Sequence, residues 1–199
     1  MNKSVYDSPD NTSVSRKHIL TVLVDNEPGV LARVIGMFSG RGYNIDSLNV
    51  AEVSNDEHLS RITIVTEGTS EVVNQIEKQL LRIVPVHSVS NLDEEGSAVE
   101  AEVALVNIDL NEANKKKIYE VCDFYRARKI ENENNSVIFE IAGASERINR
   151  FIKEMNQITK IEIVRSGPVA ISRALPEGFL STATRQGTPA PLSYSARTV

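Results

Sequence analysis

The sequence predicts an α+β protein made of two tandem domains, each with the element order β-α-β-β-α-β. Three observations predict this fold class. Apolar runs typical of strands alternate with stretches whose apolar residues recur at helical spacing. This order of elements occurs twice in 199 residues, a length that suits two small domains. A polar segment, residues 93–97, separates the two copies.

The first domain is expected over residues 16–93. Residues 16–25 form its first strand, and residues 25–29 form a turn that leads into a helix. Pro28 suits the first helical position, where a missing N–H costs nothing. Gly40 and Gly42 are natural helix ends. Between Pro28 and Gly40 lies one apolar stripe: Val30, Leu31, Val34, Ile35 and Phe38.

The rest of the first domain continues in the same way. Two strands are expected near residues 43–54 and 60–67, joined by a polar turn. Thr69 or Ser70 can cap the second helix, and a last strand covers residues 86–92. The apolar side of that helix consists of Val72, Val73, Ile76, Leu80 and Ile83. The resulting order is the split βαβ, or ferredoxin-like, arrangement.

The second domain is expected over residues 98–173, after a linker of residues 94–97. Its elements are expected as a strand at 99–110, a helix at 112–126, strands at 128–132 and 137–141, a helix at 145–159, and a strand at 160–165 that has room to extend through 169–171. Residues 1–15 are polar and aperiodic and predict a disordered arm. Residues 174–199, rich in Pro, Gly, Ser and Thr, predict a disordered tail.

The sheet of the first domain needs a cover on one face. A four-stranded sheet with both helices on one side leaves the other side open, yet the first strand supplies apolar residues to both faces. Ile19 and Leu23 oppose Leu20, Val22 and Val24. A second copy of the domain is the simplest cover. The sequence therefore predicts a homodimer through the first domain.

The composition argues against several partners. A net charge of −5 and a pI near 5.3 do not suit a nucleic-acid backbone, which calls for a basic face. No apolar run approaches the ~20 residues that span a bilayer, and the first residues do not resemble a secretion signal. The one cysteine, Cys122, excludes an internal disulfide and fits a reducing cytoplasm. Its place in an apolar helical stripe favours a core position over a reactive thiol.

Catalytic and RNA-binding functions lack the residues that they would need. His18, His58 and His87 have no metal-ligand spacing, and Gly40-Arg41-Gly42 ends a helix instead of forming a phosphate loop. RNA-recognition domains share this strand order, but they stack bases on aromatic residues of the sheet. The expected third strand has no aromatic residue.

The turn at residues 25–29 has the most informative chemistry. A strand ends and a helix begins there, so the N–H groups of Gly29, Val30 and Leu31 lie at the positive end of the helix dipole. Such a helix start can hold a carboxylate, and a residue without a side chain lets the ligand approach the backbone. Asn26 offers an amide oxygen to an ammonium group. The set suits a free amino acid.

Three further residues complete this candidate site. Asn44 lies where the chain re-enters the sheet, and Ile45 and Val50 can form the wall for an apolar side chain. Local geometry alone explains Asn26 and Gly29 equally well as residues that shape the turn.

A family resemblance favours the ligand site. The segments that show it are Asn-Glu-Pro-Gly-Val-Leu (26–31), Arg-Val (33–34), Phe-Ser-Gly-Arg-Gly-Tyr-Asn-Ile (38–45) and Ser-Leu (47–48), with support from residues 59–64, 75–80 and Val-Arg-Ser-Gly (164–167). Through residues 18–49 the chain closely resembles the ACT domain, an amino-acid-sensing module. Over roughly residues 16–173 it resembles the small regulatory subunit of acetohydroxyacid synthase (acetolactate synthase).

The resemblance implies a subunit without chemistry of its own. In that family the small subunit activates a large catalytic subunit, which uses thiamine diphosphate, FAD and a magnesium ion. It also confers feedback inhibition by valine in the synthesis of valine, leucine and isoleucine. By position, the amino acid is held by two chains: Asn26, Gly29, Val30 and Leu31 from one, and Asn44 and Ile45 from the other. An alternative is a free-standing ACT-domain sensor for another enzyme, although such a sensor would not need the second domain.

Overall fold

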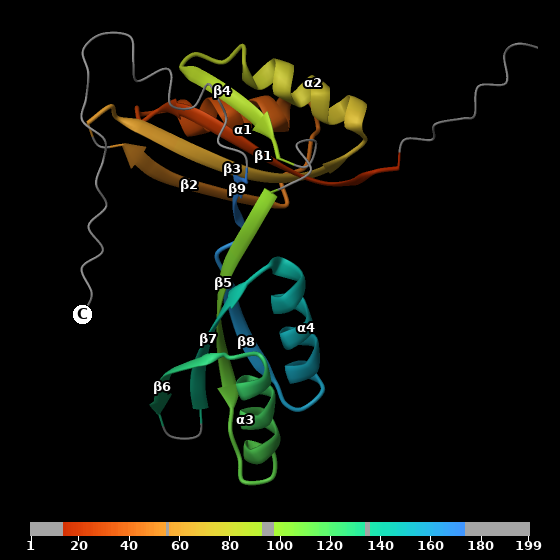
Figure 1. The fold of residues 1–199 in the computed structure, drawn as a ribbon. Coiled ribbons are helices and arrows are strands. Elements are labelled where there is room, and N and C mark those ends of the chain that lie inside the picture. The colour runs from red at the N-terminus through yellow and green to blue at the C-terminus, as the bar shows by residue number, and fades with distance from the viewer. Residues whose placement is uncertain (1–13, 55, 93–97, 134–135, 174–199) are drawn as a thin grey trace, which may run out of the picture.

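The computed structural model describes residues 14–54, 56–92, 98–133 and 136–173. Two lobes, one from each half of the chain, are joined by a narrow neck (Figure 1). Their elements are β1 (Arg16–Asp25), α1 (Val30–Gly40), β2 (Ser47–Ser54), β3 (Leu59–Gly68), α2 (Ser70–Leu80), β4 (Val86–Asn91), β5 (Ala98–Asp109), α3 (Lys115–Phe124), β6 (Arg128–Glu133), β7 (Ser136–Gly143), α4 (Ser145–Asn156), β8 (Ile161–Arg165) and β9 (Val169–Ser172). The prediction of two tandem ferredoxin-like domains is confirmed.

The first sheet has the strand order β2-β3-β1-β4, and all neighbours are antiparallel. β1 and β3 pair over their whole lengths, from Arg16 opposite Gly68 to Asp25 opposite Leu59. Every second residue of β1 faces the helices, which is how a strand of period two builds one side of a core. The core consists of Leu20, Val22, Val24, Ile62 and Ile64 from the sheet, and Val30, Val34, Phe38, Val73, Ile76 and Leu80 from the helices.

The second sheet has the order β6-β7-β5-β8, and β9 pairs with the beginning of β5. β5 is twelve residues long because it pairs with β9 at its beginning and with β7 and β8 over the rest of its length. Its first four residues pair with β9 in the neck, and residues 102–109 pair with β7 inside the domain. The second core consists of Ala104, Val106, Ile108, Ile118, Cys122, Tyr125, Val137, Phe139, Ile141, Ile148, Phe151 and Met155.

The start of α1 differs from the prediction. The helix begins at Val30 and not at Pro28. The Val30 N–H donates to the Glu27 carbonyl (3.4 Å), and Gly29 has φ 87° and ψ −8°. This is a type II turn with Pro28 at its second position and Gly29 at its third, where a positive φ is required. Gly29 is therefore first of all a conformational requirement, and a Cβ there would contact nothing within 4 Å.

Two other boundaries differ for local reasons. α3 was expected from residue 112 but begins at Lys115, because the side chains of Asn111 and Asn114 each accept a backbone N–H from the other and hold the preceding residues in a turn. The last strand was expected to be able to run on through residue 171. It is instead divided into β8 and β9, because Gly167 turns the chain with φ 74°.

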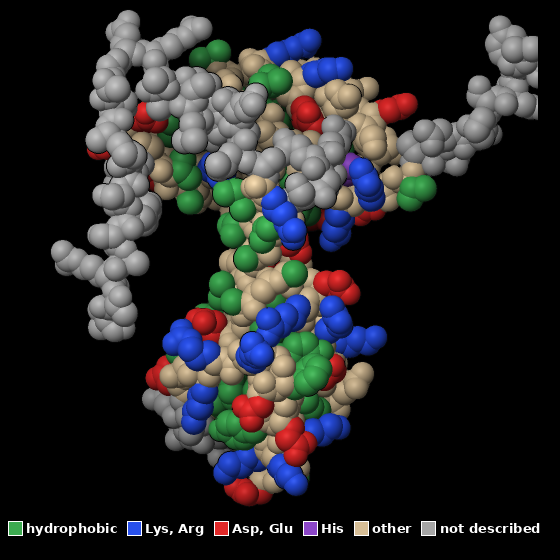
Figure 2. Space-filling view, in the orientation of Figure 1, with side chains coloured by type: hydrophobic (Ala, Val, Ile, Leu, Met, Phe, Trp, Pro, Cys, Tyr) green, Lys and Arg blue, Asp and Glu red, His purple; other side chains and the backbone are tan. Residues whose placement is uncertain are grey.

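The open face of the first sheet is partly covered by the β5–β9 pair of the same chain. Asn49 Nδ2, on β2, donates to the Pro168 carbonyl (3.0 Å) just before β9. An apolar cleft of about 320 Å³ lies between β2–β3 and the β5–β9 pair. Figure 2 shows the apolar side chains of the neck, where Val169 and Ile171 are more than half exposed. The second domain thus supplies part of the cover that we expected from a second copy, and the homodimer stays a prediction.

Several predictions concern residues outside the described ranges. These are the linker at 94–97, the tail at 174–199 and nearly all of the arm at 1–15. The exact domain limits therefore stay predictions. Among the described helices, none has the length and apolar character needed to cross a bilayer.

Candidate functional site

The turn that begins α1 is held by two other segments of the domain and by one ion pair of its own. The Asn26 N–H donates to the His58 carbonyl (2.5 Å), which ties the turn to the segment before β3. Arg33, one turn into the helix, donates to the Glu27 carboxylate (2.9 Å) and to the Val84 carbonyl. The position of the helix start therefore depends on contacts with two other segments and not on the turn alone.

This fixed turn presents unpaired donors. The Val30 N–H, expected to be free, is already engaged with Glu27. Within the described part of the chain, the N–H groups of Gly29, Leu31 and Ala32 donate to no acceptor, as is normal for the first turn of a helix. Gly29 and the Asn26 side chain are exposed. The arrangement offers hydrogen-bond donors and a positive dipole end to an anion, with a neutral amide beside them.

The other three predicted site residues lie elsewhere in the same chain. The Asn44 carbonyl accepts a hydrogen bond from the Thr66 hydroxyl (2.6 Å), and Thr66 pairs with His18 near the beginning of β1. Asn26 follows the end of β1. His18 and Asp25 are seven positions apart on this extended strand, which corresponds to about 23 Å.

Ile45 and Val50 are also apart from the turn. Ile45 packs against the first core, and Val50 lies on β2, 45% exposed and opposite Ile62. Asn44 Nδ2 donates to Asp46 within its own chain (2.7 Å). The structure thus brings Asn26, Gly29, Val30 and Leu31 together at one end of the domain and places Asn44 and Ile45 at the opposite end.

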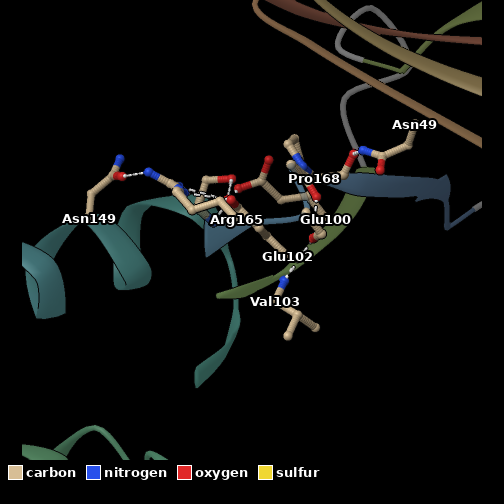
Figure 3. A network of polar contacts seen from close by, with 10 residues as sticks. Asn49, Glu100, Glu102, Val103, Asn149, Arg165 and Pro168 are labelled. Carbon is tan, nitrogen blue, oxygen red and sulfur yellow. Dashed lines mark hydrogen bonds and ion pairs between the residues drawn. The ribbon is translucent and has the colours of Figure 1, made fainter. Parts of the chain in front are cut away.

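A second polar cluster, at the boundary of the two domains, was not predicted as a site (Figure 3). The guanidinium of Arg165 donates to both carboxylate oxygens of Glu102, at 2.6 and 2.7 Å. Its remaining nitrogen donates to Asn149 Oδ1 (2.7 Å). Ser145 Oγ donates to Glu102 (2.9 Å), and the Ser145 N–H donates to Glu100 (3.1 Å). Two carboxylates therefore hold the first residue of α4.

The electrostatics of this cluster follow from burial and pairing. The Glu102 side chain is only 2% exposed. The hydrogen bonds from Arg165 lower the pKa of Glu102 below its usual value against the opposing effect of burial, and the same pair raises the pKa of Arg165. A buried carboxylate with this many donors is fully satisfied. It acts as a structural connection, and together with Arg165 it lines a cavity of about 640 Å³ at the boundary of the two domains.

The sequence does contain a signal for this cluster. Glu102 lies in phase with Ala104, Val106 and Ile108, the core-facing side of β5. A charged residue on an apolar face must be paired, so the pattern predicts a partner although it does not identify Arg165.

Metal-binding and thiol chemistry find no support in the described residues. No group of three or more His, Cys, Asp or Glu residues is placed there to hold a metal ion. Cys122 is buried, as predicted, and its burial raises the pKa of the thiol to about 12. Such a thiol is protonated at neutral pH and is a poor nucleophile.

Comparisons with known proteins agree with this architecture. Residues 20–88 match the family described as AHAS small subunit-like ACT domain, and residues 101–174 match the family described as small subunit of acetolactate synthase. The fold, the open helix start and these two matches define a regulatory protein of the ACT-domain class.

Full-length relatives specify the class further. The probable acetolactate synthase small subunit of Archaeoglobus fulgidus is 41% identical over 157 residues, which cover 79% of this chain and 97% of the relative. The isozyme 3 small subunit of Escherichia coli is 41% identical over 158 residues, with coverage of 79% and 96%. The crystal structure of the Thermotoga maritima small subunit superimposes with a TM-score of 0.73 at 35% identity, covering 80% of this chain and 99% of that one.

This chain belongs to the family of acetolactate synthase small subunits. It is a non-catalytic regulatory subunit, its partner is the large catalytic subunit, and the cofactors of the reaction belong to that partner.

Proposed function

We propose that this chain forms a homodimer that binds valine and imposes feedback inhibition by valine on the catalytic subunit, in the cytoplasm, within the synthesis of valine, leucine and isoleucine. The observation that supports this most directly is the placement of the two halves of the predicted site. Unpaired N–H groups and Asn26 lie at one end of the first domain, and Asn44 lies at the other. A single chain cannot close a small amino acid between them.

A two-fold dimer through β2 would bring the halves together. β2 is an edge strand that, within the described residues, pairs only with β3. An antiparallel pair of two β2 strands places the start of each, at Ser47, beside the end of the other, at Ser54. Ser54 pairs with Leu59, next to His58, which binds the Asn26 N–H. Asn44 of one protomer would then approach the turn of its partner. The resulting eight-stranded sheet would pair the open β2 edge of each protomer with that of the other.

The proposed recognition divides the ligand into three parts. The carboxylate of valine would accept hydrogen bonds from the N–H groups of Gly29 and Leu31. The dipole of α1 itself contributes only ~0.3–1 kcal/mol. Hydrogen bonds to a charged group contribute about 1.5–3 kcal/mol and supply more of the affinity. Asn26 and Asn44 would face the ammonium group. Leucine and isoleucine differ from valine by one methylene, which shifts discrimination by ~1–3 kcal/mol, so all three belong in the binding assay.

The test compares two substitutions at Gly29. Gly29→Ala and Gly29→Asp impose the same left-handed backbone on a residue with a side chain, and neither Cβ meets another atom within 4 Å. Only aspartate adds a negative charge where the ligand carboxylate is proposed to bind. Two like charges about 5 Å apart at an effective dielectric constant of ~20 repel by about 3 kcal/mol, so valine affinity should fall by about two orders of magnitude beyond the effect of alanine.

The measurements are calorimetry with each branched-chain amino acid and pyruvate-condensation assays of the reconstituted enzyme. Gly29→Asp should lose valine inhibition and still activate the catalytic subunit, while Gly29→Ala should keep most of both. Equal valine inhibition in the two variants would show that the helix start does not hold the carboxylate. Loss of activation in a folded Gly29→Asp protein would show that sensing and activation share one surface.

A further inference from the structure

The two domains meet at a small set of contacts on the open face of β2. Asn49 Nδ2 donates to the Pro168 carbonyl (3.0 Å), and Ser47, two residues earlier on the same face, lies directly against Gly167. We call these four residues, Ser47, Asn49, Gly167 and Pro168, the joint. Figure 3 shows Asn49 reaching from the first domain to Pro168, next to the cluster around Arg165.

The joint admits little variation at Gly167. This residue has φ 74°, and a Cβ built there would lie 2.0 Å from Ser47 Oγ and 3.2 Å from Asn49 Nδ2. Both the backbone conformation and the close approach of β2 therefore require glycine. Because Ser47 lies in direct contact with Gly167, a displacement of β2 toward Gly167 must also displace the chain there.

On one side, the joint is tied firmly to the second domain. The Ser166 N–H donates to the Val103 carbonyl (2.9 Å), and Ser166 Oγ accepts the Val103 N–H (3.1 Å). Arg165 is held by Glu102, which also binds Ser145 at the start of α4. The segment before Gly167 thus moves together with β5 and α4.

On the other side, the joint begins next to the proposed ligand contact. Asp46, the residue before Ser47, accepts a hydrogen bond from Asn44 Nδ2 (2.7 Å) and forms an ion pair with Lys17 (3.3 Å). Asn44 is therefore connected to Ser47 through its side-chain hydrogen bond to Asp46, the residue that directly precedes Ser47. A ligand that draws Asn44 toward a partner protomer would act on the beginning of β2.

From these contacts we infer that the joint is the mechanical link by which amino-acid binding in the first domain changes the position of the second domain. This inference rests on the proposed function and adds its route of transmission. Ligand binding moves the start of β2, the contact of Ser47 and Asn49 with Gly167 and Pro168 transfers this movement, and the cluster of Arg165 and Glu102 transmits it to β5 and α4. The catalytic subunit then meets a second domain in a different orientation.

The test uses the complete chain with its catalytic subunit and a matched pair of substitutions. Asn49→Asp replaces the donor that faces the Pro168 carbonyl with an oxygen and opens the joint. Asn149→Asp makes the same chemical change in the same network but keeps an acceptor for Arg165. Three quantities are measured for each: the Kd of L-valine by calorimetry, activation of the catalytic subunit without valine, and residual activity at saturating valine.

In Asn49→Asp we expect the Kd and the activation to stay within twofold of wild type, and the maximal inhibition to fall by at least half. Asn149→Asp should behave as wild type in all three. Inhibition of Asn49→Asp that equals wild type, with valine bound, would overturn the role of the joint and leave the proposed function intact. An absence of valine binding to the wild-type chain would instead overturn both.

Amide hydrogen exchange of the unmodified protein tests the same inference without any substitution that could disturb folding. L-valine should change the amide hydrogen exchange of residues 161–172 at least twofold, although none of them belongs to the proposed ligand site. Exchange that changes only near the turn at residues 25–31 and near Asn44 would contradict the inference.

Discussion

The Arg165–Glu102 pair gives a stability prediction that can be worked from the structure. In Arg165→Met the Glu102 carboxylate, 2% exposed, loses its countercharge and keeps the Ser145 hydroxyl. Breaking a buried ion pair costs about 3–5 kcal/mol because the remaining charge is left in a poor solvent. The Arg165 side chain is 35% exposed, so water can reach this side of the carboxylate. We therefore expect the free energy of unfolding of the second domain to fall by about 2–3 kcal/mol at neutral pH.

The pH dependence has a definite sign. Arg165 lowers the pKa of Glu102 in the folded protein. This group therefore stabilises the wild type above its unfolded-state pKa of about 4.3, and the contribution is lost as pH falls through the lower, folded-state pKa. In Arg165→Met, burial without a partner raises the pKa of Glu102, so the destabilisation is complete at neutral pH and fades on acidification. The difference in stability between the two proteins should shrink from pH 7 to pH 4.

Urea unfolding at several pH values measures this difference, with amide hydrogen exchange of residues 98–133 and 136–173 reporting on the second domain. Arg128→Met is the matched control, because it removes an arginine from the exposed pair with Glu140. Exposed pairs contribute little, so this variant should lose much less stability. Equal losses in the two variants, or a loss in Arg165→Met that does not change with pH, would refute the assignment of the effect to an unpaired buried charge.

Three further predictions concern single side chains. Cys122, whose thiol has its pKa raised to about 12 by burial, should resist N-ethylmaleimide in the folded protein at pH 8 and react fully in urea, as counted by mass spectrometry. Thr69→Ala removes the hydroxyl that accepts the Val72 N–H at the start of α2 and should cost about 0.5–1 kcal/mol in urea unfolding, clearly more than Ser70→Ala beside it. Phe151→Ala empties a fully buried position in the second core and should cost about 3–5 kcal/mol, with faster hydrogen exchange in that domain and unchanged protection in the first.

Elements with strong local patterns could be predicted from the sequence. β1 occupies the predicted residues 16–25, because a long apolar run ends at a polar turn. Thr69 caps α2 as one of the two predicted candidates. Pro28 was placed wrongly because a Pro-Gly pair fits two structures, the first turn of a helix and a type II turn. The positive φ of Gly29 decides between them, and only coordinates provide it.

Long-range contacts of the site were beyond the reach of sequence patterns. The alternation in β5 marks Glu102 as a charge on an apolar face, but nothing local indicates that its partner lies 63 residues later, at Arg165. Gly167 was noted only as part of a matching segment, since its contact with Ser47 requires two domains to be placed side by side. Spatial separation of Asn26 from Asn44 likewise follows from strand register and not from spacing along the chain.

The interface between the two domains is small, so a few contacts at the neck determine how the domains are oriented relative to each other. Domains of one chain that share a small interface are expected to move relative to each other. Here the first sheet meets the second domain through the joint and the β5–β9 pair, and among the described residues no core residue is shared between the two apolar clusters. Each domain therefore keeps its own core when the other moves, so a change of orientation costs only the contacts at the neck. Under the proposed function, that separation would let a weak event, the ordering of one strand edge around a small ligand, act on the orientation of a whole domain without competing against the packing of either core.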